Sequence, residues 1–301
     1  MFIIKHRKIF YALSAILILG SLFSIYFLGL KQGVDFSGGS LLSVTFDGDI
    51  PSQDKVVKIL NDLSLKDALV RTSSEGYIIR LKEISQNQKD SILGSIALLG
   101  VKPLEKTFSS VGPILGKEAL QKSWISIVLV LLVIVFFVAF AFRKVSKPIS
   151  SWTYGLVAIL ALLHDVIVPT GAFALLGYLY GFEIDTLFVT ALLVILGFSV
   201  HDTIVVFDRV RENLHKNEEY REGKNFETIV GESINQTFVR SINTSLTTLL
   251  TIVVLYIFGP ETIKHFALTL IIGLSIGTYS SIFIGSPLLV TINKWNIKRL
   301  A

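Results

Sequence analysis

The sequence lacks cysteine altogether and is poor in charge. Of its 301 residues, 17% are charged and 51% are apolar. The absence of cysteine excludes disulfide bonds and thiol chemistry, although it does not identify the compartment. A chain with so little charge is too apolar for an ordinary soluble protein, so we expect the lipid bilayer to be its solvent.

Six apolar runs are long enough to cross the hydrocarbon core, which takes about 20 helical residues. The first run follows Lys5, Arg7 and Lys8, as a secretion signal would. It is longer than a cleavable apolar region and no A-x-A site follows it, so we interpret it as a retained anchor rather than a cleaved signal. The predicted spans are residues 9–30, 124–142, 151–176, 186–207, 238–258 and 263–292.

Lysine and arginine are concentrated on one side of the predicted membrane. The short loops of the other side, 180–185 and 259–264, hold only Lys264. Because basic residues mark cytoplasmic segments, both termini are predicted to be cytoplasmic. The net charge of +5 reflects this bias and not a nucleic-acid surface, since basic and aromatic residues do not interleave. The basic side holds Lys5, Arg7, Lys8, Arg143, Lys144, Lys147, Arg209, Arg211, Lys216, Arg221, Lys224, Lys294, Lys298 and Arg299.

Residues 31–123 are the one long polar insertion, and the topology places them outside the cytoplasm. Alternating apolar residues, serine caps and turn residues predict the order β-α-β-β-α-β, a ferredoxin-like split βαβ. The insertion has no paired carboxylates, nucleophile–base pair or metal-ligand spacing, so we predict a binding or lever element and no enzyme. The predicted strands are 40–47, 67–72, 76–83 and 101–110, and the predicted helices, capped by Ser52 and Ser85, are 51–63 and 85–100.

The predicted fold class is an α-helical polytopic membrane protein. It has six transmembrane helices and a ferredoxin-like α+β domain between the first and the second. No metal and no cofactor are expected. The predicted divisions are residues 1–30 for the N-terminus and first span, 31–123 for the exported domain, 124–292 for the rest of the bundle and 293–301 for a cytoplasmic tail.

Asp202 and Arg240 lie inside predicted spans, where a central charge costs about 2.5–3.5 kcal/mol on the mildest scale. Asp202 lies six residues before Asp208, which puts it roughly 9 Å from the cytoplasmic end at 1.5 Å per residue. Arg240 lies near the cytoplasmic start of the next span, so the two depths match and we predict an ion pair. Arg240 belongs to a stripe of polar residues that recur at intervals of three and four, which places them on one face of the helix. In this stripe Asn243 and Thr247 are candidates for a proton pathway or for packing. Its members are Gln236, Arg240, Asn243, Thr247 and Thr251.

An ion pair of this kind is either a static staple or a proton switch. If helix motion separates Arg240 from Asp202, the aspartate takes up a proton, and it releases the proton when the two reunite. Each proton that crosses 100 mV yields about 2.3 kcal/mol, enough to drive a conformational step. The residues alone leave both alternatives open.

Asp165, in the middle of the third span, is a candidate for the proton pathway or for a hydrogen bond that locks packing. His164 and His201 each precede an aspartate. His201 is a candidate proton carrier, although a hydrogen-bonding role toward another helix is the favoured interpretation. Small residues recur every four positions in the last span and predict close helix packing; they are Gly273, Gly277, Ser281 and Gly285.

Five segments, together with the six spans and the single exported domain, make the sequence resemble the SecF family of membrane subunits that accompany the bacterial Sec protein-export channel. The likeness extends over nearly the whole chain. The family commonly has asparagine where this chain has His201, which either changes the proton affinity of Asp202 or adds a titrating group. The segments are GVDFSGGS (33–40), FSSVGPILGKEAL (108–120), LLHDVIVPTGAF (162–173), GFSVHDTIVVFDRVREN (197–213) and FVRSINTSLTTLLT (238–251).

The resemblance implies a function in protein export. It implies a bacterial inner-membrane subunit that forms half of a resistance-nodulation-division type assembly and uses the proton gradient, with protons as coupling ions, to help preproteins leave the channel. The implied partners are SecD, the SecYEG channel, YajC and the translocating preprotein. Asp202 and Arg240 match the family's aspartate and arginine linked to proton passage. The alternatives are half of a proton-driven efflux transporter for lipids or small molecules, and a non-transporting scaffold of the export channel.

Overall fold

The computed structural model describes residues 2–73, 75–143 and 149–300. The chain divides into two compact units, one of residues 1–31 and 125–301 and one of residues 32–124. Lys144 and Lys147, two of the residues that supported the predicted orientation, lie outside the described residues.

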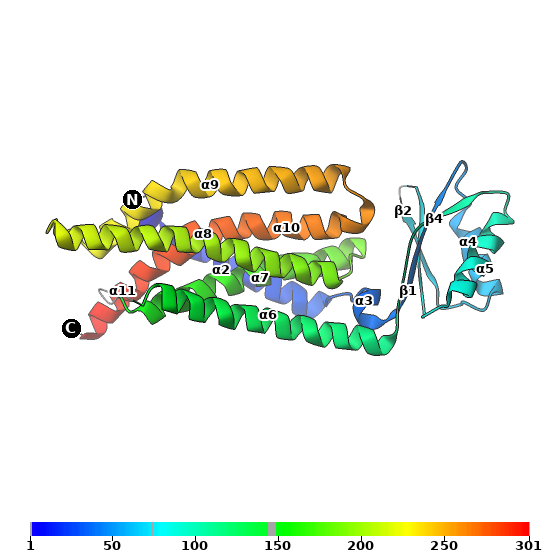
Figure 1. Cartoon of the computed structure of the whole chain (residues 1–301), viewed down its shortest axis with the longest axis horizontal. Helices are drawn as coiled ribbons and strands as arrows, with labels where there is room; N and C mark the ends of the chain where they lie inside the picture. Colours follow the sequence, from blue (N-terminus) through cyan, green and yellow to red (C-terminus); the bar gives the residue numbers. More distant parts are fainter. Residues whose placement is uncertain (1, 74, 144–148, 301) are drawn as a thin grey trace. The chain divides into compact units, whose positions relative to one another are not determined.

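Within the described ranges, six helical segments are long and apolar enough to cross a membrane, as predicted. Figure 1 shows them as a bundle whose N- and C-termini lie at the same end. A short helix α1 (Phe2–Lys5) precedes the first segment. The six are α2 (Arg7–Phe23) with the π-helical turn η1 (Ser24–Leu28), α6 (Pro113–Ala141), α7 (Ser151–Tyr180), α8 (Thr186–Glu219), α9 (Phe226–Phe258), and α10 (Glu261–Ser280) continued by the π-helical turn η2 (Ser281–Gly285) and α11 (Ser286–Leu300).

Three of the described helices, α6, α8 and α9, extend more than ten residues beyond the predicted spans. Helix α6 begins at Pro113, a residue suited to the first turn because its missing N–H is not needed there. Helix α8 continues to Glu219, well past the apolar run. Glu212 pairs with Arg209 at 2.6 Å and with Lys216 at 2.7 Å, and such pairs at three and four residues support a helix in water. Apolar length therefore marks the membrane crossing but not the end of the helix.

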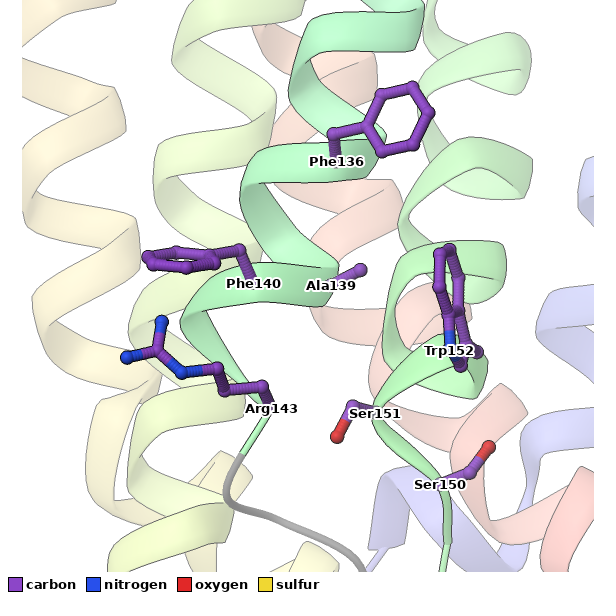
Figure 2. A pocket seen from close by; sticks show the side chains of 7 residues that line it. All are labelled: Phe136, Ala139, Phe140, Arg143, Ser150, Ser151 and Trp152. Atoms are coloured by element: carbon purple, nitrogen blue, oxygen red, sulfur yellow. The ribbon is translucent and has the colours of Figure 1, made fainter.

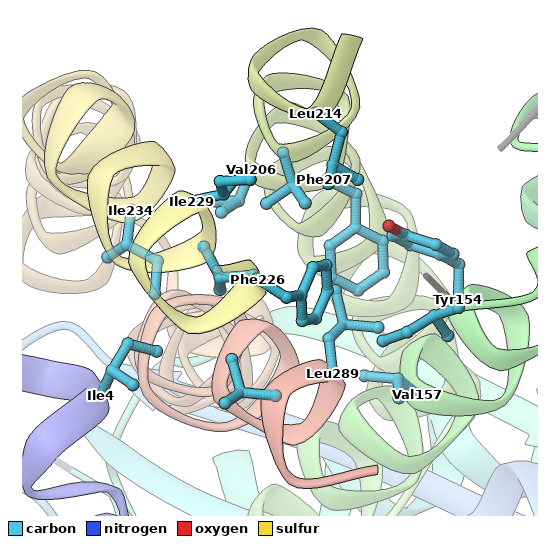
Figure 3. Close-up of a cluster of buried hydrophobic side chains, with 14 of the residues drawn as sticks. Ile4, Tyr154, Val157, Val206, Phe207, Leu214, Phe226, Ile229, Ile234 and Leu289 are labelled. Carbon is cyan, nitrogen blue, oxygen red and sulfur yellow. The ribbon is translucent and has the colours of Figure 1, made fainter. Parts of the chain in front are cut away.

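The centre of the bundle is formed by α7, α8 and α10. About half of the most apolar window of α7 and α8 is buried, whereas only 17% of that window is buried in α2, α6 and α9. At the end where α7 begins, an apolar cluster joins α6, α7, α8, α9 and α11 (Figure 3). In that cluster Tyr154 stacks on Phe142 at 5.3 Å between ring centroids and meets the Phe207 ring edge-on at 5.3 Å. Aromatic pairs of this geometry fix how α6, α7 and α8 approach one another.

The second unit is a four-stranded antiparallel sheet with two helices, and it has the predicted β-α-β-β-α-β order. The strand order in the sheet is β2-β3-β1-β4. Alternate residues of β1 and β3, such as Leu42, Val44 and Ile79, are buried against the helices. A short helix α3 (Val34–Ser37) precedes the sheet. The elements are β1 (Gly39–Phe46), α4 (Gln53–Asp62), β2 (Leu69–Ser73), β3 (Gly76–Leu81), α5 (Gln86–Ala97) and β4 (Pro103–Val111).

Two polar features position parts of this unit. Buried Lys89 of α5 donates to the Glu105 carboxylate of β4 at 2.6 Å, and this hydrogen bond raises the pKa of the Lys89 ammonium. At Gly38 the backbone has a φ of 73°, and a Cβ there would lie 2.6 Å from the Cα of Pro113. Glycine is therefore required where α3 turns into β1.

The serine that begins α5 offers a test of the local structure. The Ser85 hydroxyl accepts from the N–H of Gln88, whose side chain accepts from the N–H of Ser85, a reciprocal capping box. Ser85→Ala is expected to cost about 1 kcal/mol and to speed hydrogen exchange in the first turn of α5. Ser52→Ala is the matched control, because Ser52 occupies the N-cap of α4 without a side-chain cap bond. Equal effects of the two substitutions would contradict the capping box.

Candidate functional site

Asp165 lies at the centre of the bundle, where three helices meet. Its side chain is completely buried on α7. The Oδ2 oxygen accepts hydrogen bonds from the hydroxyls of Ser199 on α8, at 2.5 Å, and Ser280 at the end of α10, at 2.7 Å. The Oδ1 oxygen is 2.9 Å from Nδ1 of His164. The predicted hydrogen bond between Asp165 and a neighbouring helix is thus formed twice, with Asp165 as the acceptor.

Small residues allow this close approach. A Cβ on Gly277 of α10 would lie 3.1 Å from the Cβ of Ser199 and 3.7 Å from Oδ2 of Asp165. A Cβ on Gly273 would lie 2.0 Å from Ile195 of α8. The ridge predicted in the last span is therefore confirmed as the face that packs on α8, and it sets the distance between the two serine hydroxyls and Asp165.

A line of hydroxyls continues from this site along α8 and η2. Ser281 donates to the backbone carbonyl of Ser199 at 3.3 Å, and its hydroxyl lies 2.9 Å from that of Thr203. Ser281 also begins η2, where the last span turns π-helical between α10 and α11. Turns of this type inside helices are frequent at functional sites. The irregular turn brings consecutive serines, Ser280 and Ser281, to two different partners.

Asp202 lies on α8 beside Thr203 and is 5% exposed. Its Oδ2 atom is buried and has no hydrogen-bond partner among the described residues. The side chain that faces it is Ser241 of α9, whose buried hydroxyl interacts with the carboxyl group of Asp202 but does not reach full hydrogen-bond geometry. A buried acceptor left without a donor costs free energy unless it takes up a proton or a partner. The arrangement suits a carboxyl group that exchanges a proton.

The predicted ion pair between Asp202 and Arg240 is not formed in this structure. Asp202 is buried, whereas Arg240 is exposed and pairs with no acid in the described part of the chain. Adjacent residues on a helix point about 100° apart, and here Ser241 rather than Arg240 faces α8. Ser241, next to Arg240 in the sequence, faces Asp202, whereas Arg240 itself lies on the exposed side of α9. The coupling of Asp202 with Arg240 through protons stays a prediction.

The rest of the polar stripe also lies on the outer face of α9. Asn243 and Thr247 are exposed, like Arg240. The Thr247 hydroxyl donates to the carbonyl of Asn243 at 3.0 Å, so it is satisfied within its own helix. The structure therefore places these two candidates together with Arg240 and apart from Asp165. Their role in a proton pathway stays a prediction.

The two histidines differ in their surroundings. His201 is exposed and makes no hydrogen bond to a described residue, so the predicted bond to another helix is absent for it. His164 is 2% exposed and contacts the adjacent Asp165, while its Nε2 atom is buried without a described partner. Ser280 is one of the site residues that sequence reasoning missed. Its signal was the neighbouring small-residue ridge, which marked the face of the last span that approaches α7 and α8.

A separate hollow of about 450 Å³ lies between the end of α6 and the start of α7 (Figure 2). The guanidinium of Arg143 lies 3.8 Å from the centre of the Phe140 ring, and Trp152 stands on the opposite side. No acidic residue lines the hollow among the described residues. It therefore does not join the titratable groups of the bundle.

Comparisons with known families agree with this architecture. Residues 96–295 match the family model of the protein export membrane protein SecD/SecF, C-terminal, and residues 23–50 match the SecD/SecF GG motif. The chain is 44% identical to the protein translocase subunit SecF of Thermobaculum terrenum over 96% of this chain and 93% of that protein. It is 37% identical to SecF of Anaerolinea thermophila over 96% of this chain and 92% of that protein.

A solved structure shows the same likeness. SecDF from Thermus thermophilus, described as a translocon-associated membrane protein, aligns with a TM-score of 0.82 and 29% identity over 97% of this chain. The chain spans 38% of the length of that SecDF protein. The family match, the full-length relatives and the common fold agree, and the chain belongs to the SecF family of protein translocase subunits.

Proposed function

We propose that this chain is an accessory subunit of the Sec translocase that uses the proton gradient, together with SecD, to promote the translocation and release of preproteins. The observation that carries the proposal is the likeness to SecF subunits over almost the entire chain, at 44% identity to one of them. A translocase subunit of this kind needs no catalytic group. Half of an efflux transporter and a passive scaffold are the competing functions.

The case for proton use rests on Asp202. This carboxyl group is nearly buried, and one of its oxygens has no hydrogen-bond partner among the described groups. Such burial destabilises the charged carboxylate more than the neutral acid. A helix motion that brings a cation or water to it reverses that preference. Arg240 lies at a similar depth on the neighbouring helix but points away, so rotation or displacement of α9 would change the state of Asp202. This supports the switch over the staple.

The exposed face of α9 supports a membrane partner. Arg240, Asn243 and Thr247 share this face, and they are too polar to lie against lipid tails. Polar residues within spans face a bundle interior or another helix. The aligned SecDF protein is longer than this chain, and SecD is the partner that we place against α9. SecYEG, YajC and the preprotein are further partners of the proposed complex.

The proposed topology follows the distribution of basic residues. Both termini lie at one end of the bundle, and we assign that end to the cytoplasm because the basic segments gather there (Figure 1). Residues 32–124, whose strand order is that of a ferredoxin-like split βαβ, then belong to the periplasmic side. Such a domain would contact the preprotein after it leaves the channel.

Affinity purification in mild detergent tests the proposed assembly. The tagged chain is expected to bring down SecD and the SecYEG channel subunits, which mass spectrometry identifies. Half of an efflux transporter would bring down another transporter half and no channel subunits. Arg240→Leu is expected to weaken recovery of SecD while Lys264→Leu, at the opposite end of the bundle, leaves it unchanged. Recovery of the chain alone would contradict the proposal.

A further inference from the structure

The hollow between α6 and α7 takes no part in the proton step proposed for Asp202. Its lining includes the rings of Phe136 and Phe140 on α6 and of Trp152 on α7, which are shown in Figure 2. These side chains are 62%, 63% and 66% exposed, in that order, so the hollow opens outward from the bundle. Its volume of about 450 Å³ lies within the range of about 300–1,000 Å³ that is typical of small-molecule sites.

The outer face of α6 leads to this hollow as a stripe of exposed apolar side chains. They follow one another at intervals of four, three and four residues, which places them on one face of the helix. The stripe contains no glycine, alanine or serine, the small residues that let two membrane helices approach closely. The stripe therefore suits lipid tails better than a partner helix, unlike the small-residue ridge of the last span. Its members are Leu129, Val133, Phe136 and Phe140.

The described lining of the hollow carries a positive charge at the end of this stripe. The guanidinium of Arg143 lies 3.8 Å from the centre of the Phe140 ring, a cation–π contact that holds it beside the opening. No acid lines the hollow among the described residues, and Ser150 adds a hydroxyl to the lining. The Ser151 hydroxyl donates to the carbonyl of Phe142 at 2.7 Å, which links the start of α7 to the end of α6. The hollow is therefore complementary to an anion.

The hollow lies at the end of the bundle that holds both termini (Figure 1). Phe142, beside the hollow, packs in one apolar cluster with Ile3 and Ile4 of α1. Under the proposed topology this end faces the cytoplasmic leaflet, which carries anionic lipids, and basic pockets between membrane helices on that side bind acidic headgroups. Tryptophan is also enriched at this depth, where the membrane meets water.

We propose that this hollow binds an anionic phospholipid of the bilayer, with the phosphate at Arg143 and an acyl chain along the stripe on α6. A free phosphate ion would meet the same cation but would leave the apolar stripe uncovered. The phospholipid matches both the charge and the apolar face. The inference rests on the proposed function only for the choice of the cytoplasmic leaflet.

Quenching of Trp152 fluorescence by lipids that carry bromine on their acyl chains tests the proposal. The chain has 3 tryptophans, and Trp124→Phe with Trp295→Phe leaves Trp152 as the only one. The full chain is reconstituted in phosphatidylcholine vesicles that contain a minor fraction of brominated phosphatidylglycerol or, in a parallel sample, the same fraction of brominated phosphatidylcholine. We expect the phosphatidylglycerol to quench Trp152 more strongly. Equal quenching by the two lipids would overturn the proposal, and so would its absence with both, because another protein surface would then cover the face.

Two variants separate this site from the general charge of the chain. Arg143→Leu should lower the preference for phosphatidylglycerol about fivefold, since one basic residue near an anionic leaflet contributes about 1 kcal/mol. Lys298→Leu is the matched control, because Lys298 is an exposed basic residue that does not line the hollow, and it should keep the preference. An equal loss in the two variants, or no loss in Arg143→Leu, would contradict the site. Unchanged quenching by brominated phosphatidylcholine shows that each variant is inserted as the parent is.

Inorganic phosphate distinguishes the two sources of the anion. An excess of inorganic phosphate should leave the preference for phosphatidylglycerol in place, because the acyl chain on the stripe contributes to binding. If inorganic phosphate removes the preference, the hollow takes a free anion and the lipid proposal is wrong. Failure to recover SecD in the affinity purification would contradict the proposed function and leave the quenching results unaffected.

Discussion

Gly171→Ala is expected to separate α2 from α7 and to lower the free energy of unfolding by about 3 kcal/mol. A Cβ at this position would lie 2.3 Å from the Cα of Ser21 and 2.6 Å from its hydroxyl. Contacts with backbone atoms are not relieved by a side-chain rotation, so the helices themselves must move apart. Unfolding of the purified protein in a detergent titration measures the loss.

The same substitution on the facing helix provides the control. A Cβ on Gly20 of α2 would meet nothing within 4 Å, so Gly20→Ala adds a methyl group in open space. Removing a glycine from a helix interior is expected to be neutral or to stabilise by about 0.5–1 kcal/mol. If the Gly171→Ala and Gly20→Ala variants had the same free energy of unfolding, α2 and α7 would not be in this close contact.

The membrane architecture could be predicted from the sequence because it depends on one-dimensional properties. Apolar length alone gave six spans, and alternation with caps gave the order of the elements in residues 32–124. The ends of the helices were harder to predict from the sequence. Helix α8 continues past its apolar run, where Val210 and Leu214 pack in the apolar cluster with Phe226 of α9 and Glu212 pairs with Arg209 and Lys216, contacts that hydropathy does not register.

Asp202 and Arg240 were recognised as charges inside predicted spans, but the direction of Arg240 on its helix was not predicted. The depths counted for the two residues stay predictions. Which side of α9 faces α8 depends on how helices rotate against one another, and the sequence of one chain does not contain that information. The polar stripe consequently lies outside the bundle, where a partner subunit would decide its contacts.

The hydrogen bonds of Asp165 with Ser199 and Ser280 also depend on how the helices pack, which the sequence does not give. Asp165 was recognised because a charge in a span is rare. Its hydrogen bond with Ser199 joins residues on two helices, and the packing of Gly277 against Ser199 helps to bring the two side chains to 2.5 Å. The small-residue ridge pointed to a close contact without identifying its partner.

Asp202→Asn is expected to reduce preprotein release in energised vesicles to the level seen without a proton gradient. Asparagine keeps the size and polarity of the side chain but cannot take up and release a proton. A proton moving through 100 mV supplies about 2.3 kcal/mol, and without a titrating group at Asp202 that energy is not delivered to the bundle. Release of a radiolabelled preprotein, with and without an uncoupler, measures the difference.

Asp208→Asn is the matched control for this prediction. Asp208 lies on the same helix, but it is exposed and pairs with Arg211 at 2.6 Å, so the substitution removes a surface charge of low energetic value. Asp208→Asn should keep the full gradient-dependent release. If Asp202→Asn also keeps it, Asp202 is not the proton-carrying group, and the scaffold function becomes the better account. If both variants lose it, the effect comes from α8 as a whole rather than from the buried carboxyl group.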